Sequence, residues 1–252
     1  MSSDNQVGGP RPEQPVVLVT GASGGLGQAL AMEFDSLGCR VAVHYNSAEA
    51  QARAVQEKLH NDSVLVTGDV ASWDAVTEMY ERISEHLGAI DVLVNNGAIR
   101  KDSLMAMQSP ESWRQVIETN LLGTFHTTRA AIPAMLRKRW GRVINVVSPS
   151  GLIATSGQTA YSASKAGVIG MTRTLAAECG RRGVTVNALS PGFMETTMTK
   201  DLSAKATDAI KDKTPIPRFG VPEEVARSAA FFLDSDYMTG QVISIDGGVS
   251  IT

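Results

Sequence analysis

Short runs of β-branched and other apolar residues recur along the chain from Val16 onward, and longer segments with helical spacing of apolar positions separate them. The runs are close to continuously apolar, which is typical of parallel strands buried on both faces. We therefore predict seven strands, at residues 16–20, 40–45, 63–67, 90–95, 141–147, 184–190 and 241–246.

The segments between these runs predict helices, and several begin at a Ser or Pro start signal such as Ser72 or Pro222. The predicted helices cover residues 25–37, 47–60, 72–87, 111–138, 158–181, 199–213 and 222–233. Strands alternating with helices form βαβ units, and no Pro-rich or Gly/Ser-rich linker interrupts residues 15–252. We expect a single α/β domain with a doubly wound, parallel, seven-stranded sheet.

Residues 1–14 carry almost no apolar side chains, so we expect them to form a disordered leader. The N-terminus lacks the charged-then-apolar order of a signal peptide, and no apolar run approaches the length of a membrane span. These features predict a cytoplasmic protein that does not bind membranes.

Charge and metal-ligand content exclude further classes of protein. The chain has 26 acidic and 23 basic residues, a net charge of -3 and no basic stripe, so nucleic acid is not an expected partner. Its two cysteines and four histidines show no metal-ligand spacing, so no metal site is expected.

A glycine-rich segment joins the first predicted strand directly to a helix. Glycines allow a sharp turn and close approach to a pyrophosphate, which the N-terminus of the following helix would stabilise. No Lys follows the glycines, so the segment is not a P-loop. It predicts a Rossmann-type dinucleotide site at Gly21, Ser23, Gly24, Gly25, Leu26 and Gly27.

The end of the second strand bears on the choice between NAD(H) and NADP(H). An acidic residue there would bind the ribose 2′-hydroxyl and repel a 2′-phosphate. The chain instead has Asn46 and Ser47, which can donate hydrogen bonds to a phosphate. This favours NADP(H), although an ordinary polar loop would look the same.

Tyr161 and Lys165 are four residues apart in a predicted helix, so their side chains lie on one face. An ammonium group near a phenol stabilises its phenolate and lowers its pKa, which would make Tyr161 a usable general acid. Ser148 follows the fifth strand at the ligand-binding edge and can hold a carbonyl. No G-x-S-x-G motif surrounds Ser148, so hydride transfer is favoured over hydrolysis.

Across residues 15–252 the chain resembles the short-chain dehydrogenase/reductase family, through five motifs in the family's order. They are Thr20-Gly21-x-x-x-Gly25-x-Gly27, Asp69-Val70, Asn95-Asn96-Gly97-Ala98, Ser148 with Tyr161-x-x-x-Lys165, and Pro191-Gly192. The resemblance implies that Ser148 holds the carbonyl, Tyr161 donates a proton, Lys165 binds the nicotinamide ribose, and Asn120 holds a water in the proton relay. Ser150 is the alternative to Ser148.

The same resemblance implies further cofactor contacts at Asp69, Val70, Asn95, Gly97, Tyr161, Lys165, Pro191, Gly192, Met194 and Thr196. Two positions depart from the family pattern. The family's Asn-Asn-Ala-Gly is Asn-Asn-Gly-Ala here, which changes the residue that can adopt positive φ. Gly24 stands where many NADPH-dependent members carry a basic residue.

Within the family the chain is most similar to 3-oxoacyl-[acyl-carrier-protein] reductases, through Pro191-Gly192-Phe193-Met194-Glu195-Thr196 and Arg218-Phe219-Gly220. This implies a homotetramer, in which the helices at 111–138 and 158–181 form one interface. It also implies the acyl carrier protein as a partner of Arg139 and Arg182, although cations are favoured at helix ends without any partner.

The resulting hypothesis is an NADPH-dependent reductase of a 3-oxoacyl thioester small-molecule substrate. Acetoacetyl-CoA and polyketide ketoreductases share much of the pattern. A dehydrogenase of a small alcohol, sugar or steroid-like ring remains open, because the same catalytic set serves many carbonyls. A non-enzyme that senses NADP(H) is the further alternative, but it would not need Tyr161 and Lys165.

Overall fold

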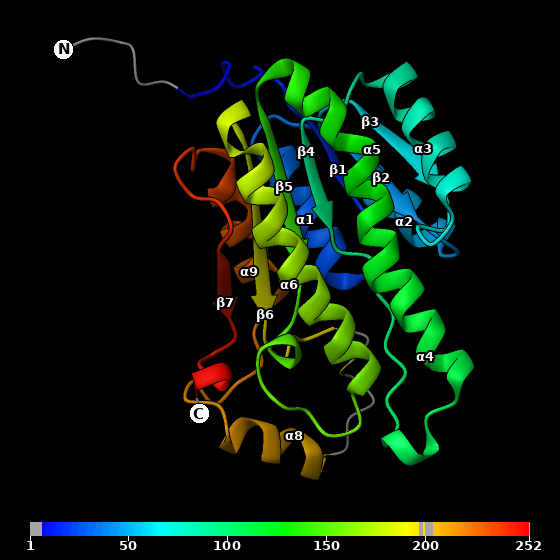
Figure 1. Cartoon of the computed structure of the whole chain (residues 1–252), viewed down its shortest axis with the longest axis vertical. Coiled ribbons are helices and arrows are strands. Elements are labelled where there is room, and N and C mark those ends of the chain that lie inside the picture. The colour runs from blue at the N-terminus through cyan, green and yellow to red at the C-terminus, as the bar shows by residue number, and fades with distance from the viewer. Residues whose placement is uncertain (1–6, 197–198, 200–203, 252) are drawn as a thin grey trace, which may run out of the picture.

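Seven parallel strands form one sheet in the computed structural model, which describes residues 7–196, 199 and 204–251. The strands are β1 (Val16–Val19), β2 (Arg40–Tyr45), β3 (Ser63–Thr67), β4 (Val92–Asn95), β5 (Gly141–Val146), β6 (Val184–Pro191) and β7 (Val242–Ile245). Their spatial order is β3-β2-β1-β4-β5-β6-β7. The order reverses beside β1, which confirms the predicted doubly wound Rossmann-type sheet (Figure 1).

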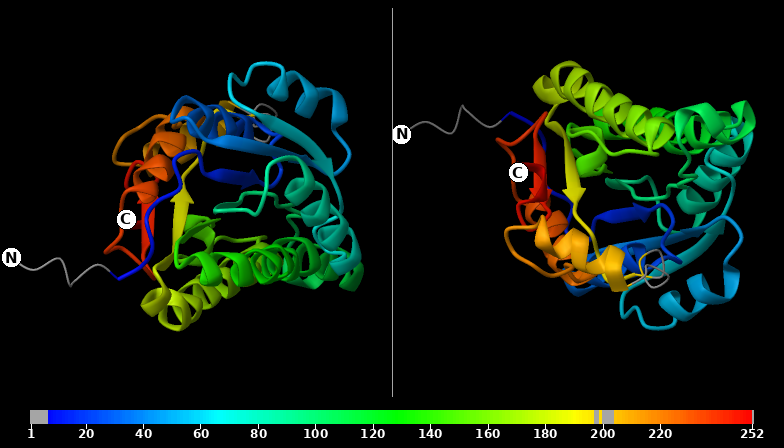
Figure 2. Two further views of the ribbon diagram at one scale, coloured as in Figure 1. Left: turned by 90° about the horizontal axis from the view of Figure 1, so that it is seen from above. Right: turned by 90° about the horizontal axis from the view of Figure 1, so that it is seen from below.

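Helices cover both faces of the sheet (Figure 2). They are α1 (Gly25–Ser36), α2 (Glu49–Gln56), α3 (Trp73–His86), α4 (Pro110–Ile117), α5 (Gly123–Lys138), α6 (Thr159–Cys179), α8 (Ala204–Asp212) and α9 (Pro222–Ala230). One apolar cluster joins the sheet to α1, α2 and α9, and the other joins it to α3, α5 and α6. Helix α8 lies beyond the carboxyl ends of the strands (Figure 1).

Strand β1 explains why the strands are continuously apolar. Val17 and Val19 belong to the first cluster, whereas Val16 and Leu18 belong to the second. All four side chains are at most 1% exposed. Successive side chains of a strand point to opposite faces, so a strand covered on both sides needs apolar residues at every position.

Capping residues set several helix starts. The Ser72 hydroxyl accepts a hydrogen bond from the Ala75 amide at 3.3 Å, before the first residue of α3. Helix α9 has Pro222 in its first turn, and the Glu224 carboxylate accepts from the Val221 amide at 3.0 Å. Both starts follow the signals in the sequence.

The predicted helix at 111–138 is not one continuous α-helix. A π-helical turn, Glu118–Leu122, separates α4 from α5. Pro133 lies inside α5 without ending it. The predicted helix at 199–213 corresponds to α8, and residues 200–203 of that prediction lie outside the described residues.

The chain before β1 lies against the sheet's amino edge. The Gly9 amide donates to the Arg139 carbonyl at 2.7 Å, and Arg11 pairs with Asp234. Residues 1–6 of the predicted leader lie outside the described part. Within the described residues, no helix is long and apolar enough to span a bilayer.

Candidate active site

A cleft of about 480 Å³ lies at the carboxyl ends of β1, β4, β5 and β6, where open parallel sheets bind ligands. Segments that follow these four strands line it, together with the start of α6. It brings together many of the predicted site residues. These are Gly21, Ser23, Gly24, Gly25, Leu26, Gly27, Gly97, Ser148, Tyr161, Lys165, Pro191, Gly192, Met194 and Thr196.

The turn from β1 into α1 has the form of an anion cradle. The first N–H groups of a helix have no intrahelical acceptor, and Gly24 before α1 supplies no side-chain cap. Gly21 adopts a φ of 64°, and a Cβ on Gly27 would lie 2.2 Å from the Gly21 carbonyl oxygen. The cradle therefore requires these two glycines and fits the pyrophosphate of a dinucleotide.

His44, near the end of β2, holds this turn in place, although it belongs to none of the sequence motifs. Its Nδ1 accepts a hydrogen bond from the Gly21 amide at 3.0 Å, and its Nε2 lies 2.8 Å from the Gly68 carbonyl oxygen. The carbonyl only accepts, so Nε2 must carry the proton. Burial lowers the pKa of His44, against opposing effects of Gly68 and Asp69, which favours this neutral form.

The segment after β4 is tied to the same turn. The Thr20 hydroxyl accepts from the amides of Asn96 and Gly97, both at 2.9 Å. Gly97 does not adopt positive φ, and a Cβ there would meet Thr20 and Gly21 at 3.4 Å or more. The exchange of Gly and Ala relative to the family pattern therefore places no special conformational demand on Gly97.

Five predicted cofactor residues do not line the cleft: Asn46, Ser47, Asp69, Val70 and Asn95. Asn46 and Ser47 are exposed after β2, and Asp69 caps its own turn through the Ala71 amide at 2.9 Å. The Asn95 amide group donates to Thr128 at 3.0 Å and to Asn145 at 2.9 Å, and its oxygen accepts from Thr127 at 2.7 Å. The Asn95 side chain therefore joins β4 to β5 and α5.

Tyr161 and Lys165 meet in the cleft, as their spacing on α6 predicts. The Lys165 ammonium lies 5.6 Å from the centre of the Tyr161 ring and donates to the Val146 carbonyl at 2.8 Å. Lys165 is 4% exposed, and burial lowers its pKa from 10.5 to about 8. It therefore remains largely protonated at neutral pH.

The pKa of Tyr161 differs from the expectation. Burial raises it above its ordinary value, while the Ser148 hydroxyl and the charge of Arg100 lower it and Asp102 raises it. In the protein without a cofactor, burial of the phenol therefore outweighs the lowering of the Tyr161 pKa that the sequence predicts from Lys165. A phenol that keeps its proton at neutral pH is suited to act as an acid.

The two candidate serines have different surroundings. The Ser150 hydroxyl donates to Gln158 at 2.7 Å and accepts from Thr155 at 3.2 Å. The Ser148 hydroxyl accepts from the Ser150 amide at 3.3 Å and is placed to donate its own proton toward Tyr161, whose pKa it lowers. The geometry favours Ser148 as the group that holds a carbonyl.

Asn120 lies in the π-helical turn behind the cleft and is 1% exposed. Its oxygen accepts from the Ile99 amide at 2.8 Å, and its amide group donates to the Ile99 carbonyl at 2.9 Å and to Ser164 at 3.2 Å. These bonds connect α6 to the segment after β4. π-Helical turns of this kind are frequent at functional sites.

Arg139 and Arg182 lie close together at the opposite edge of the sheet. They precede β5 and β6, and both are exposed. Arg139 adopts a φ of 56° at the end of α5, and Arg182 donates to the Leu136 carbonyl of α5 at 3.2 Å. Since β5 is six residues long, about 20 Å separates this pair from Ser148.

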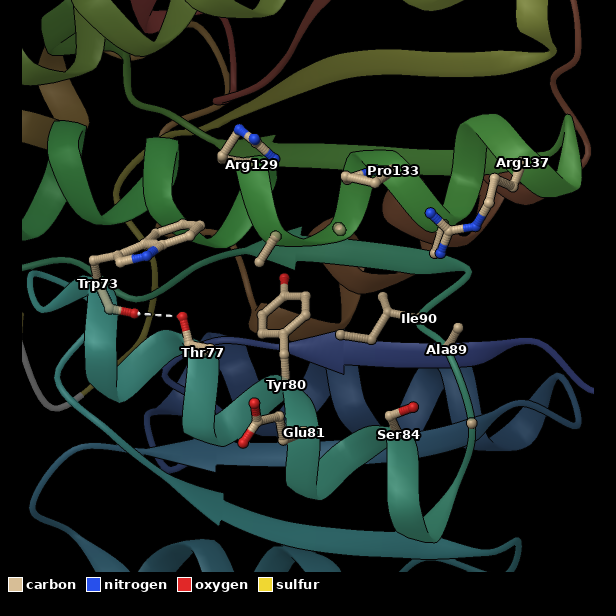
Figure 3. A pocket seen from close by; sticks show the side chains of 14 residues that line it. Trp73, Thr77, Tyr80, Glu81, Ser84, Ala89, Ile90, Arg129, Pro133 and Arg137 are labelled. Atoms are coloured by element: carbon tan, nitrogen blue, oxygen red, sulfur yellow. Dashed lines mark hydrogen bonds between the residues drawn. The ribbon is translucent and has the colours of Figure 1, made fainter.

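A second pocket lies between α3 and α5 (Figure 3). Trp73, Tyr80, Ile90 and Pro133 line it, and the Tyr80 hydroxyl donates to the Thr127 carbonyl at 2.6 Å. It contains none of the predicted site residues. In the described part of the chain, no cluster of three or more His, Cys, Asp or Glu side chains could hold a metal ion.

Comparison with known proteins identifies the family of the chain. The model of a family described as enoyl-(acyl carrier protein) reductase matches residues 21–250. Together with the fold and the Ser148, Tyr161 and Lys165 arrangement, this match shows that the chain belongs to the short-chain dehydrogenase/reductase family. It is therefore an oxidoreductase acting on CH–OH or C=O groups.

Particular relatives narrow the comparison. The chain is 42% identical over 238 residues to a 3-oxoacyl-[acyl-carrier-protein] reductase of Staphylococcus epidermidis, covering 92% of this chain and 97% of the relative. It is also 42% identical to the enzyme of that name from Thermotoga maritima, covering 96% of this chain and 100% of the relative.

Solved structures give the same fold. A protein described as a gluconate dehydrogenase of Agrobacterium tumefaciens has a TM-score of 0.91 and 32% identity, over 98% of this chain and 100% of that one. A gluconate 5-dehydrogenase of Burkholderia cenocepacia, in complex with NADP and tartrate, has a TM-score of 0.90 and 28% identity, over 96% and 97% of the two chains.

Proposed function

We propose that this protein reduces 3-oxoacyl thioesters to 3-hydroxyacyl thioesters with NADPH. One observation carries the proposal: a single cleft combines the glycine cradle with Ser148, Tyr161 and Lys165. The relatives at about 42% identity, named 3-oxoacyl-[acyl-carrier-protein] reductases, supply the substrate class. NADP in the Burkholderia neighbour, and the absence of an acid at Asn46 and Ser47, support the choice of cofactor.

The residues of the cleft divide the chemistry among them. The dinucleotide, when bound in the cradle, supplies the hydride that reaches the 3-carbonyl carbon. Ser148 donates a hydrogen bond to the carbonyl oxygen, and such a donor at a developing oxyanion contributes about 3 to 4 kcal/mol. Tyr161 transfers its proton to the same oxygen and becomes a phenolate.

Lys165 makes that proton transfer favourable. Its ammonium group lies beside the Tyr161 ring and carries a charge at neutral pH, so it stabilises the phenolate that forms. One ammonium proton is committed to the Val146 carbonyl, which fixes the side chain. The remaining protons are available to the ribose hydroxyls and, through them, to Tyr161. Asn120 connects α6 to the segment after β4 behind the cleft, and it would hold the water that returns a proton to Tyr161.

We further propose a homotetramer. The exposed face of α6 carries small side chains, at Ala163, Ala166, Gly170 and Ala177, which allow another helix to approach closely. Phe125 and Leu122 beside it are 46% and 40% exposed. Burial of such a surface against a second copy is favourable. As its place in the cell, we propose the cytoplasm.

Arg139 and Arg182 are proposed to bind an acidic acyl carrier protein. The two arginines lie about 20 Å from Ser148 of the same protomer, so the oligomer could bring them closer to the cleft of another protomer. If α6 packs on its own copy across a two-fold axis perpendicular to the helix, the two helices run antiparallel. The end of α6 near Arg182 then approaches the partner's cleft. A carrier on one protomer would thus deliver its thioester to the next.

A second candidate is the oxidation of a polyhydroxy acid, as the names of the two structural neighbours indicate for those proteins. Arg100 lines the cleft and would suit a carboxylate. The identity to these neighbours, 28% and 32%, is lower than that to the thioester reductases. We therefore rank this candidate second.

The test is NADPH oxidation, followed at the nicotinamide absorbance, with acetoacetyl groups on carrier protein and on coenzyme A, and repeated with NADH. We expect turnover of both thioesters and a preference for NADPH. Arg139→Glu with Arg182→Glu should raise the KM for the carrier-linked substrate alone. No turnover of either thioester, with reduction of NADP+ by gluconate, would replace the first candidate by the second.

A further inference from the structure

The part of the cleft beyond the cofactor cradle contains a charged group that neither the cradle nor the proton relay uses. Among the described residues that line the cleft, Arg100 and Lys165 are the two charged ones. Lys165 donates to the Val146 carbonyl and stands beside Tyr161. Arg100 is left as the second cation of the cleft, which Ile153 and Phe193 also line.

The backbone on both sides of Arg100 is held firmly. Ile99, directly before it, is bonded through both its amide and its carbonyl to the Asn120 side chain, at 2.8 and 2.9 Å. Farther along, the Ser103 amide donates to the Gly157 carbonyl at 2.8 Å. The short segment 99–103 is therefore attached at one end to the π-helical turn and at the other to the residue before Gln158.

The side chain of Arg100 is oriented as well. Its Nε lies 3.2 Å from the Asp102 carboxylate, and Gln158 donates to the same carboxylate oxygen at 3.0 Å. Gln158 in turn accepts from Ser150 at 2.7 Å. The ion pair with Asp102 involves Nε of Arg100. Within the described residues, neither terminal guanidinium nitrogen has a hydrogen-bond partner. Both terminal nitrogens thus remain as donors for a ligand, on a side chain that is 33% exposed.

The position of Arg100 places these donors in the same cleft as the reacting groups. Arg100 and Tyr161 line the same cleft. Gln158, which donates to the Asp102 carboxylate beside Arg100, directly precedes α6 and lies three residues before Tyr161, whose hydroxyl must lie at the reacting oxygen. A 3-oxoacyl thioester has a second acceptor, the thioester carbonyl, two carbons from the reacting carbonyl. A guanidinium group near Tyr161 suits an acceptor at that short spacing.

We propose that Arg100 is a specificity-determining residue that binds the thioester carbonyl of the substrate, with Asp102 and Gln158 holding it in position. The inference rests on the proposed function and names what distinguishes a 3-oxoacyl thioester from other ketones in this cleft. A cation that hydrogen-bonds a substrate carbonyl favours that substrate over an analogue without the carbonyl, because the charge-assisted hydrogen bond is lost with the analogue.

The test compares two substrates that differ in one group. The first is the 3-oxobutanoyl thioester of N-acetylcysteamine, and the second is the thioether ketone in which a CH₂ replaces the thioester carbonyl. For each enzyme the ratio of the two kcat/KM values is measured. Any effect of Arg100 on the pKa of Tyr161 changes both rates alike and cancels in the ratio.

In Arg100→Met we expect the ratio to fall by about 10 to 100-fold, because the guanidinium donors are removed while the methyl ketone is still reduced. Asp102→Asn keeps the guanidinium but weakens its anchor, so a fall of about 2 to 10-fold is expected. Lys101→Met is the matched control, since Lys101 is exposed, bonds to Gln115 and does not line the cleft. Its ratio should equal that of the wild type.

Two results would overturn the inference in different ways. If Arg100→Met binds NADPH normally and slows both substrates equally, Arg100 does not bind the thioester carbonyl, and the proposed function stands. If the wild-type protein reduces the thioether ketone but not the thioester, the proposed function fails and the inference fails with it.

Discussion

The two halves of the cleft are built from different groups. The half after β1 presents main-chain N–H groups, and its defining residues are glycines such as Gly21 and Gly27. The half after β5 presents side chains, and Tyr161 and Lys165 define it. In the first half a side chain must be missing, whereas in the second a particular functional group must be present.

Their electrostatics differ in the same way. Beside the glycine turn, burial lowers the pKa of His44 and favours a neutral ring that satisfies the backbone. Beside β5, a buried Lys165 remains charged at neutral pH even though burial lowers its pKa to about 8. The cofactor half is thus organised for binding, and the catalytic half keeps a destabilising charge for chemistry.

The largest expected effect breaks the catalytic half alone. Tyr161→Phe removes the acidic proton and retains the ring, so kcat should fall by about 10²- to 10⁴-fold. The Kd for NADPH, measured by fluorescence titration, should change by less than about threefold, because the glycine cradle is untouched. Retained turnover would remove Tyr161 from the mechanism.

The next prediction measures the energetic cost of the buried ammonium. The folded-state pKa of Lys165, about 8, lies below the value of 10.5 for an unperturbed lysine. Between these values the unfolded chain binds more protons, so the free energy of unfolding should rise with pH. The gain is at most about 3 kcal/mol, at about 1.4 kcal/mol for each pKa unit.

Denaturant unfolding of the cofactor-free protein from pH about 7 to about 10 checks this expectation. Lys165→Met has no such proton to lose, so the difference in stability between variant and wild type isolates the contribution of Lys165. Parallel pH profiles for the two proteins would show that the ammonium is not destabilised in the folded protein.

The sequence predicted the sheet closely because each strand is buried on both faces. β2 and β3 have the predicted bounds, and the other strands differ by at most two residues at either end. The break between α4 and α5 could not be predicted in this way. No Pro or Gly marks residues 118–122, and the π-helical turn is held by bonds from Asn120 to Ile99, 21 residues away.

The site could be predicted where function is encoded in adjacent residues. The glycine turn and the Tyr161–Lys165 pair are local patterns, and both line the cleft. His44 and Arg100 were missed because their roles depend on neighbours that only the fold supplies. His44 contacts Gly21 and Gly68, which belong to turns 23 and 24 residues away on either side. Asn95 matched a motif, yet its side chain faces the interior.

The third prediction tests whether the cofactor half requires a glycine at position 27. A Cβ on Gly27 would approach the Gly21 carbonyl oxygen to 2.2 Å, so Gly27→Ala should destabilise the fold by about 1 to 3 kcal/mol and weaken NADPH binding. At Gly24 the nearest atom would be 3.6 Å away, so Gly24→Ala is a matched control. Thermal unfolding and NADPH titration of the two variants should differ clearly, and equal effects would contradict the steric argument.

The smallest expected effect separates the two bonds of His44. His44→Asn retains an acceptor near the position of Nδ1, whereas His44→Gln retains a donor near that of Nε2. Because the Gly21 amide needs the acceptor, NADPH affinity should fall about 5- to 10-fold in the Gln variant and less in the Asn variant, which corresponds to about 1 kcal/mol for one hydrogen bond. The kcat at saturating NADPH should change little in either variant.

Acid pH gives the same comparison a second readout. The folded-state pKa of His44 is lowered, so its contribution to stability is present above the unfolded value and lost as the pH falls through the folded value. Asp69, whose charge raises this pKa, is common to both proteins. NADPH affinity of the wild type should therefore drop in acid more steeply than that of His44→Asn, whose amide does not titrate. Identical acid profiles would mean that protonation of His44 does not disturb the glycine turn.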